Sequence, residues 1–118
     1  MKQRAIGDFK FKHADGKASD EQPVSNYPDI VVHERTTNDV LLFLACDGIW
    51  DVLSDADVTR FLTRFLHAQL TEESSDIIRP EYLAGACDAL IALCLERNST
   101  DNMTALAVHL GGGSRRSS

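Results

Sequence analysis

The chain has 118 residues, 43% of them hydrophobic and 25% charged, which predicts one small globular unit with a single core. With 18 Asp and Glu against 12 Lys and Arg, the formal net charge is −6. This charge disfavours binding to a nucleic-acid backbone and permits binding of cations or basic partners. No apolar run approaches the ~18 residues of a membrane helix, and the first ten residues lack a signal-peptide core, so we expect neither a membrane span nor export.

The three cysteines are an odd number and contain no CxxC pair. This pattern disfavours both a disulfide framework and a zinc site, and it is typical of a reducing compartment. We therefore expect an intracellular location, either cytoplasmic or nuclear.

The first third of the chain predicts two short strands separated by a long loop. Residues 4–12 alternate loosely between apolar and polar side chains, as a strand does. Residues 13–28 are polar and contain Gly16, Pro23 and Pro28, which favour a loop. The brief β-branched run over 29–35, DIVVHER, predicts the second strand.

The next stretch is apolar at every position from Val40 to Cys46, which is typical of a strand covered on both faces. Asp47 and Gly48 follow it directly. A carboxylate is thus expected at the end of a rigid strand, beside a sharp turn that the glycine permits. Trp50 is expected in the core rather than as a stacking platform for a ligand.

Two helices are predicted after this strand. The first should span about 55–70, because Ser54 and Asp57 have the S-x-x-D form of a capping box and apolar residues then recur with helical spacing. The second should begin at Pro80, which suits a first helical position, and stop near Arg97 and Asn98.

Residues 102–110 alternate along two faces and predict a last strand, and residues 111–118, GGGSRRSS, predict a flexible tail. Consecutive strands followed by helices indicate an α+β fold with helices packed on a sheet. A strand covered on both faces lacks partners in so small a set of elements. The chain is therefore expected to be part of a larger fold, with the rest missing or supplied by another copy.

Two carboxylates are candidates for a metal site. Asp47 ends one strand and Asp101 precedes the last one, so the two converge if these strands are neighbours. Clustered carboxylates repel unless a cation lies between them, and oxygen-only sites suit Mg²⁺ or Mn²⁺. The alternative is that both aspartates are turn formers that accept local backbone hydrogen bonds. Asp51 either supports the site or belongs to an acidic helix start favoured by the helix dipole.

Three segments resemble, in order and spacing, motifs of the metal-dependent serine/threonine protein phosphatases of the type 2C family. They are QRAIGDFKFK at 3–12, LLFLACDGIWDVLSDADV at 41–58 and RNSTDNMTALAV at 97–108. The resemblance implies the C-terminal portion of a four-layer αββα sandwich with antiparallel sheets. Residues 1–110 would then be a partial catalytic domain whose N-terminal half is absent.

The resemblance also implies a mechanism, in which two or more Mg²⁺ or Mn²⁺ ions activate a water that attacks phosphoserine or phosphothreonine without a phosphoenzyme. Asp47 and Asp101 match metal-binding aspartates of the family. Gly48 would permit a close turn and Asn102 would orient the second loop. Asp51 matches a further aspartate of the motif and would act through water. Arg4, Gly7 and Asp8 would be mainly structural.

The family's DGHGG segment, an earlier acidic motif and a phosphate-binding arginine have no counterpart in this sequence. We therefore expect little phosphatase activity from the chain alone. One interpretation is a fragment or half of a phosphatase that acts on a phosphoprotein and needs a complementing N-terminal half. The other is a non-catalytic, phosphatase-like regulatory or interaction module. Uncovered sheet edges predict self-association under either one.

Overall fold

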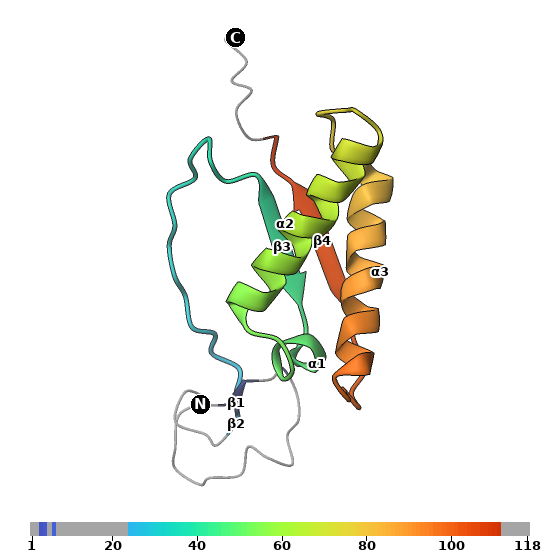
Figure 1. Ribbon diagram of the computed structural model, residues 1–118. Helices are drawn as coiled ribbons and strands as arrows, with labels where there is room; N and C mark the ends of the chain where they lie inside the picture. Colours follow the sequence, from blue (N-terminus) through green and yellow to red (C-terminus); the bar gives the residue numbers. More distant parts are fainter. Residues whose placement is uncertain (1–2, 5, 7–23, 112–118) are drawn as a thin grey trace, which may run out of the picture. The chain divides into compact units, whose positions relative to one another are not determined.

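The computed structural model describes residues 3–4, 6 and 24–111 (Figure 1). The chain forms two compact units, residues 1–34 and 35–118. Gly7, Asp8 and residues 112–118 of the expected tail lie outside the described residues. No helix in the described part of the chain is long and apolar enough to cross a membrane.

In the first unit, two short strands pair in parallel. β1 (Gln3–Arg4) lies beside β2 (Val24–Ser25), with Gln3 opposite Val24. The strand expected over 4–12 is thus described only at its start, because Ile6 is already in a bend and residues 7–12 lie outside the described part. β2 falls where a loop was predicted, so that part of the prediction is wrong.

The predicted strand over 29–35 is also wrong. These residues form no regular secondary structure and no strand pairing, and Ile30, Val31 and Val32 are 80%, 90% and 91% exposed. A β-branched run favours a strand only where a neighbouring strand and a packing surface are available. Neither is present for this run among the described residues.

The second unit is a two-stranded antiparallel sheet with two helices packed on one face (Figure 1). In chain order its elements are β3 (Leu41–Ala45), α1 (Asp47–Trp50), α2 (Asp55–Glu72), α3 (Pro80–Glu96) and β4 (Ala105–His109). This arrangement confirms the predicted α+β class and places the last strand within its expected range. The short helix α1 was not predicted.

The pairing of β3 with β4 runs from Leu41 opposite His109 to Ala45 opposite Ala105. Because the strands are antiparallel, the end of β3 lies beside the start of β4. The residues that follow β3 and those that precede β4 are therefore brought to the same edge of the sheet.

The two faces of this sheet differ in burial. Leu41, Phe43 and Ala45 on β3 pack against the core with Ala105 on β4. The side chains of the opposite face are 38–56% exposed, and they are Leu42, Leu44, Leu106 and Val108. The expectation that the strand over 40–46 is covered on both faces is thus wrong for the described residues, since one layer of helices covers only one face.

The core lies between the sheet and the helix pair. Its buried members come from α1, from the loop after it and from both long helices, and they are Ile49, Leu53, Val58, Leu62, Leu66, Tyr82, Ala86, Leu90 and Cys94. Burial of each large apolar side chain stabilises the fold by about 1.5–3 kcal/mol. Helix α1 is anchored here, since Ile49 is fully buried.

Helix α2 begins with the predicted capping box. The Asp57 backbone N–H donates to Ser54 Oγ at 3.1 Å, and the Ser54 N–H donates to Asp57 Oδ2 at 3.1 Å. Hydrogen bonding of its carboxylate by the Ser54 backbone N–H and by the Ser54 side chain, aided by the charges of Arg97 and Arg60, holds the pKa of Asp57 below its ordinary value. The reciprocal bonds satisfy two backbone donors that the helix start would leave unpaired. They fix where α2 starts.

Replacing Ser54 by Ala should therefore lower the free energy of unfolding by about 1 kcal/mol and the melting temperature by about 4–8 °C. Ser54→Asn keeps an acceptor at the cap and should melt close to the wild type. Thermal unfolding followed by circular dichroism measures both. Equal melting temperatures for the alanine variant and the wild type would show that the cap contributes nothing.

Candidate metal centre

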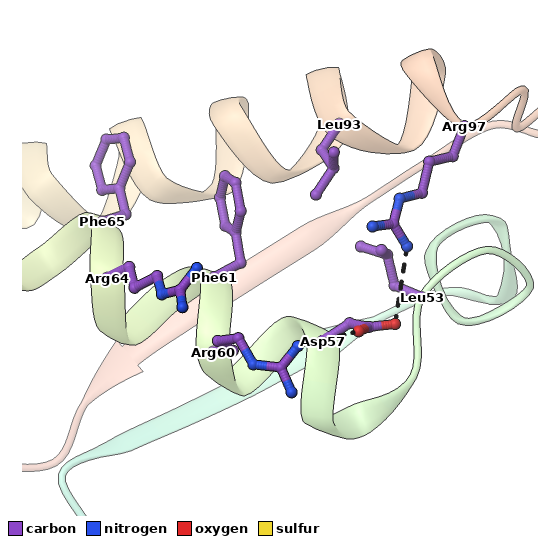
Figure 2. A pocket seen from close by; sticks show the side chains of 8 residues that line it. All are labelled: Leu53, Asp57, Arg60, Phe61, Arg64, Phe65, Leu93 and Arg97. Atoms are coloured by element: carbon purple, nitrogen blue, oxygen red, sulfur yellow. Dashed lines mark ion pairs between the residues drawn. The ribbon is translucent and has the colours of Figure 1, made fainter.

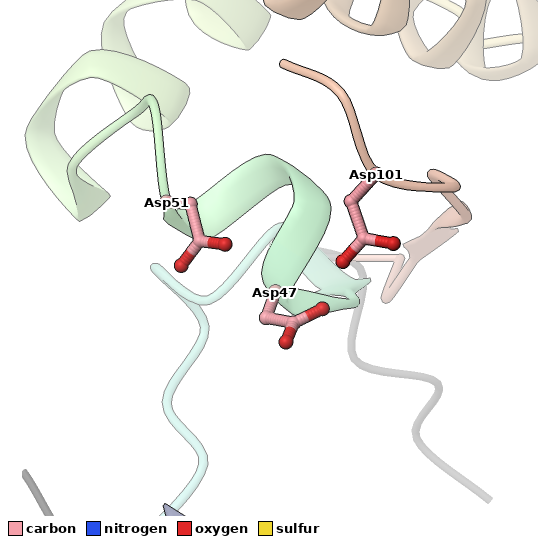
Figure 3. Close-up of side chains that lie close together, drawn as sticks. All are labelled: Asp47, Asp51 and Asp101. Carbon is pink, nitrogen blue, oxygen red and sulfur yellow. The ribbon is translucent and has the colours of Figure 1, made fainter.

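Three aspartate side chains converge at the edge where β3 ends and β4 begins (Figure 3). Asp47 is the first residue of α1, Asp51 is the C-cap of the same helix, and Asp101 lies in the loop before β4. One carboxylate oxygen from each lies within 4.8 Å of the others. All three side chains are exposed. The predicted convergence of Asp47 and Asp101 is confirmed, and Asp51 joins them.

Helix α1 places two of these carboxylates. The Asp51 N–H donates to the Asp47 carbonyl at 2.8 Å, which closes a helical turn and leaves the two side chains on one face. The expected sharp turn at this point is therefore a helical turn. Asp51 ends α1 and does not start α2, which Ser54 caps, so the alternative of an acidic helix start is wrong for Asp51.

The chain reversal at the C-terminus of α3 positions the third carboxylate, that of Asp101. Asn98 has a positive φ of 64°, the Ser99 N–H donates to the Cys94 carbonyl at 3.0 Å, and the Asn98 N–H donates to the Leu95 carbonyl at 3.1 Å. This pair of bonds is a Schellman motif, which ends a helix and reverses the chain. The reversal brings Asp101 back toward α1. Asp101 Oδ1 also accepts the Asn102 N–H at 2.8 Å, so the expected local role of this carboxylate is present as well.

Gly48 sets the spacing between α1 and the loop before β4. A Cβ at this position would lie 2.5 Å from the Asn102 carbonyl oxygen and 2.9 Å from Met103 Cγ. Cβ atoms essentially never make so short a contact, so a side chain at this position would push α1 away from the loop before β4. The glycine that was expected to permit a close turn instead permits a close approach of two backbones.

Two side chains that the sequence reasoning missed join the same loops. Cys46 Sγ donates to the Asn102 carbonyl at 3.4 Å and accepts the Thr104 N–H at 3.3 Å. Ser99 Oγ donates to the Gly48 carbonyl at 2.8 Å. The Asn102 backbone carbonyl is thus in contact with Cys46, while the orienting role of Asn102 stays a prediction. The only sequence signal was position, because Cys46 and Ser99 lie next to or near the two candidate ligands.

Trp50 supports α1 from the side of the sheet. Its Nε1–H donates to the Ala45 carbonyl at 3.0 Å, and its ring meets Phe43 edge-on with centroids 5.8 Å apart. Trp50 as a whole is 38% exposed, so the prediction of a core position is only partly met. Through these contacts Trp50 holds α1, which carries Asp47, against the end of β3.

The donor set of this cluster fits a hard divalent cation. All its ligand atoms are carboxylate oxygens, and within the described ranges no basic side chain forms an ion pair with Asp47, Asp51 or Asp101. Three like charges this close repel one another, and a cation between them relieves the repulsion. Mg²⁺ and Mn²⁺ bind through a few carboxylates while keeping water in the remaining positions, which an exposed cluster allows.

Comparison with known proteins decides the family. A family model described as protein phosphatase 2C matches residues 3–103. The chain belongs to the protein phosphatase 2C family. The matched range covers the first two segments whose resemblance the sequence indicated and the third as far as residue 103. It includes Asp47, Asp51 and Asp101.

Curated relatives agree with this membership. The chain is 37% identical over 116 residues to protein phosphatase 2C homolog 2 of Aspergillus fumigatus, a match covering 93% of the chain and 24% of the relative. It is 37% identical over 105 residues to protein phosphatase 1B of Mus musculus, covering 89% of the chain and 24% of the relative. The chain thus spans about a quarter of the length of these relatives.

Because of the close approach at Gly48, replacing this glycine by alanine should lower the free energy of unfolding, whereas the same change inside a helix usually raises it. Gly to Ala inside a helix ordinarily stabilises by roughly 0.5–1 kcal/mol. Gly48→Ala should instead lower the free energy of unfolding by about 1–3 kcal/mol, since the added methyl overlaps the Asn102 carbonyl. Urea denaturation measures the change.

Gly85→Ala in α3 is the matched control, because its Cβ meets only the edge of the Phe65 ring at 3.3 Å. This variant should be close to neutral. A stabilised Gly48→Ala protein would mean that the two loops do not approach as closely as the structure has them.

Proposed function

We propose that this chain carries part of the active site of a metal-dependent protein serine/threonine phosphatase. Asp47 and Asp101 are the metal ligands, and Asp51 supports them through water. The observation that carries the proposal is the convergence of the α1 carboxylates with Asp101, which lies 54 residues after Asp47, in a chain of the phosphatase 2C family.

A divalent cation, when bound, lowers the pKa of a water toward neutrality and stabilises the charge of a phosphoryl transition state. The chain's own residues hold the ligands in place for this. Asp47 is fixed at the first residue of α1, whose Ile49 is buried in the core. Gly48, Cys46 and Ser99 hold the Asp101 loop against that helix. The substrate class is a phosphoprotein bearing phosphoserine or phosphothreonine, and the ion is Mg²⁺ or Mn²⁺.

The exposed face of the β3–β4 sheet is where we place the remainder of the catalytic domain. Its four apolar side chains form a continuous strip on two paired strands, which is the surface that a second sheet packs against in a sandwich. A complementing N-terminal half would thus complete both the four-layer αββα sandwich and the metal site, which needs two or more ions.

Metal binding is the first test. Titration calorimetry with MnCl₂ or MgCl₂ should give weak binding to the 118-residue chain, because few carboxylates hold a strongly hydrated ion. Asp47→Asn and Asp101→Asn should abolish the heat of binding. Asp51→Asn should weaken binding about tenfold, as loss of a group that acts through water does.

Asp76→Asn is the matched control, since it removes one exposed carboxylate outside the cluster. It should bind manganese as the wild type does. Unchanged binding in both Asp47→Asn and Asp101→Asn would remove these residues from the metal site, and an equal loss in Asp76→Asn would mean that only net charge matters.

Phosphatase activity is the second test. Manganese-dependent phosphate release from a phosphothreonine peptide should be low for the chain alone and should rise when the N-terminal part of a family catalytic domain is added. The restored activity should be absent with Asp47→Asn or Asp101→Asn and kept with Asp76→Asn. Strong release by the chain alone would contradict the need for a second half.

The exposed apolar strip also favours a second candidate, a non-catalytic module that uses this face to pair with a partner or with itself. The same experiment separates the two functions. Complex formation with an N-terminal half, without any phosphate release, would support the interaction module and contradict the catalytic role.

A further inference from the structure

Apart from the aspartate cluster, the helix pair carries a pocket of about 410 Å³ (Figure 2). We call it the arginine pocket, and it shares no residue with the aspartate cluster. Its volume lies in the range typical of ligand sites, about 300–1,000 Å³. The chemistry of its floor and rim indicates what could bind.

The floor of the pocket is apolar. It consists of Leu53, Phe61, Phe65 and Leu93, and Figure 2 shows the two phenylalanine side chains extending from α2 toward α3. The Phe rings stack with centroids 6.4 Å apart and planes 20° apart. The edge of the Phe65 ring lies against α3 at Gly85, where an added Cβ would lie 3.3 Å from Phe65 Cζ. Such a floor suits one aromatic or branched aliphatic side chain.

The rim is cationic. Arg60 and Arg64 lie one turn apart on α2, and Arg97 follows α3. Asp57 is the one carboxylate of the lining, and it faces Arg60 at 3.7 Å and Arg97 at 3.8 Å while its oxygens also serve the Ser54 cap. Arg64 has no ion-pair partner among the described residues. The lining therefore has a formal charge of +2 on a chain whose net charge is −6.

We propose that the arginine pocket binds a short segment of a partner protein in which an aromatic or aliphatic side chain is flanked by acidic residues. The apolar side chain enters between Phe61 and Leu93, and the flanking carboxylates meet the guanidinium groups, whose planar fork binds carboxylates in pairs. At physiological ionic strength, salt screens charges that lie more than about 8 Å away. The local electrostatic potential at the pocket is therefore set by the arginines of the rim and not by distant acidic residues.

The spacing of the rim favours a peptide over a small anion. Side chains one helical turn apart are about 5–6 Å apart at Cβ, as Arg60 and Arg64 are placed. Alternate side chains of an extended peptide lie on one side of the chain about 6.6 Å apart, which matches this spacing. The proposal does not depend on the phosphatase function, because binding is measured without metal or catalysis.

Fluorescence anisotropy of a labelled peptide, added to the 118-residue chain, tests the proposal. The probe is an eight-residue peptide with one Phe between two Asp-Glu pairs. A second peptide has Asn and Gln in place of the acids, and a third has Ala in place of Phe. We expect binding of the first to weaken with added salt, and the other two to bind at least about tenfold more weakly.

Arg64→Gln should weaken binding of the first peptide about tenfold, through loss of one charged hydrogen-bonding partner. The matched control is Arg79→Gln, an exposed arginine before α3 that lies outside the pocket lining. It makes the same change of charge and should leave binding unchanged. Circular dichroism checks that both variants keep their helices.

Four results would overturn the proposal. They are no binding of the first peptide at ~1 mM, equal binding of the amide peptide, an equal loss in Arg64→Gln and Arg79→Gln, and tighter binding of free phenylacetate than of the peptide. The last result would assign the pocket to a small aromatic anion.

Discussion

The contact on which the site depends is the approach of Gly48 to the backbone of Asn102. An added Cβ would lie 2.5 Å from the Asn102 carbonyl oxygen, so only a residue without a side chain lets α1 lie this close to the loop before β4. Because Asp47 precedes that glycine and Asp101 precedes that asparagine, the same contact sets the distance between the two carboxylates. A shift of either backbone would separate the oxygens that lie within 4.8 Å.

The rest of the second unit maintains this contact. Antiparallel pairing of β3 with β4 brings the two loops to one edge of the sheet, and the Schellman motif at the end of α3 turns the chain toward α1. Ile49 anchors α1 in the core, and hydrogen bonds from Cys46 and Ser99 join the loops directly. The cluster thus combines a buried hydrophobic anchor with exposed charges.

Sequence patterns predicted what local interactions determine. The capping box at Ser54, the start of α3 at Pro80 and the convergence of two aspartates were all correctly derived. The features that sequence patterns could not predict depend on contacts between distant parts of the chain. The bonds of Cys46 and Ser99 span more than 50 residues, and the run over 29–35 has strand propensity but no pairing partner. The apolar run over 40–46 likewise predicted cover on both faces of the sheet, but whether the outer face is covered depends on residues outside β3 and β4.

The most direct test of the metal centre is paramagnetic broadening by substoichiometric Mn²⁺ in the amide spectrum of the 118-residue chain. If Asp47 and Asp101 share an ion, the signals of residues 47–51 and 98–104 should broaden together at the lowest manganese concentration, ahead of other acidic segments such as 72–76. Broadening of only one of the two loops, or of all acidic segments alike, would contradict a shared metal site.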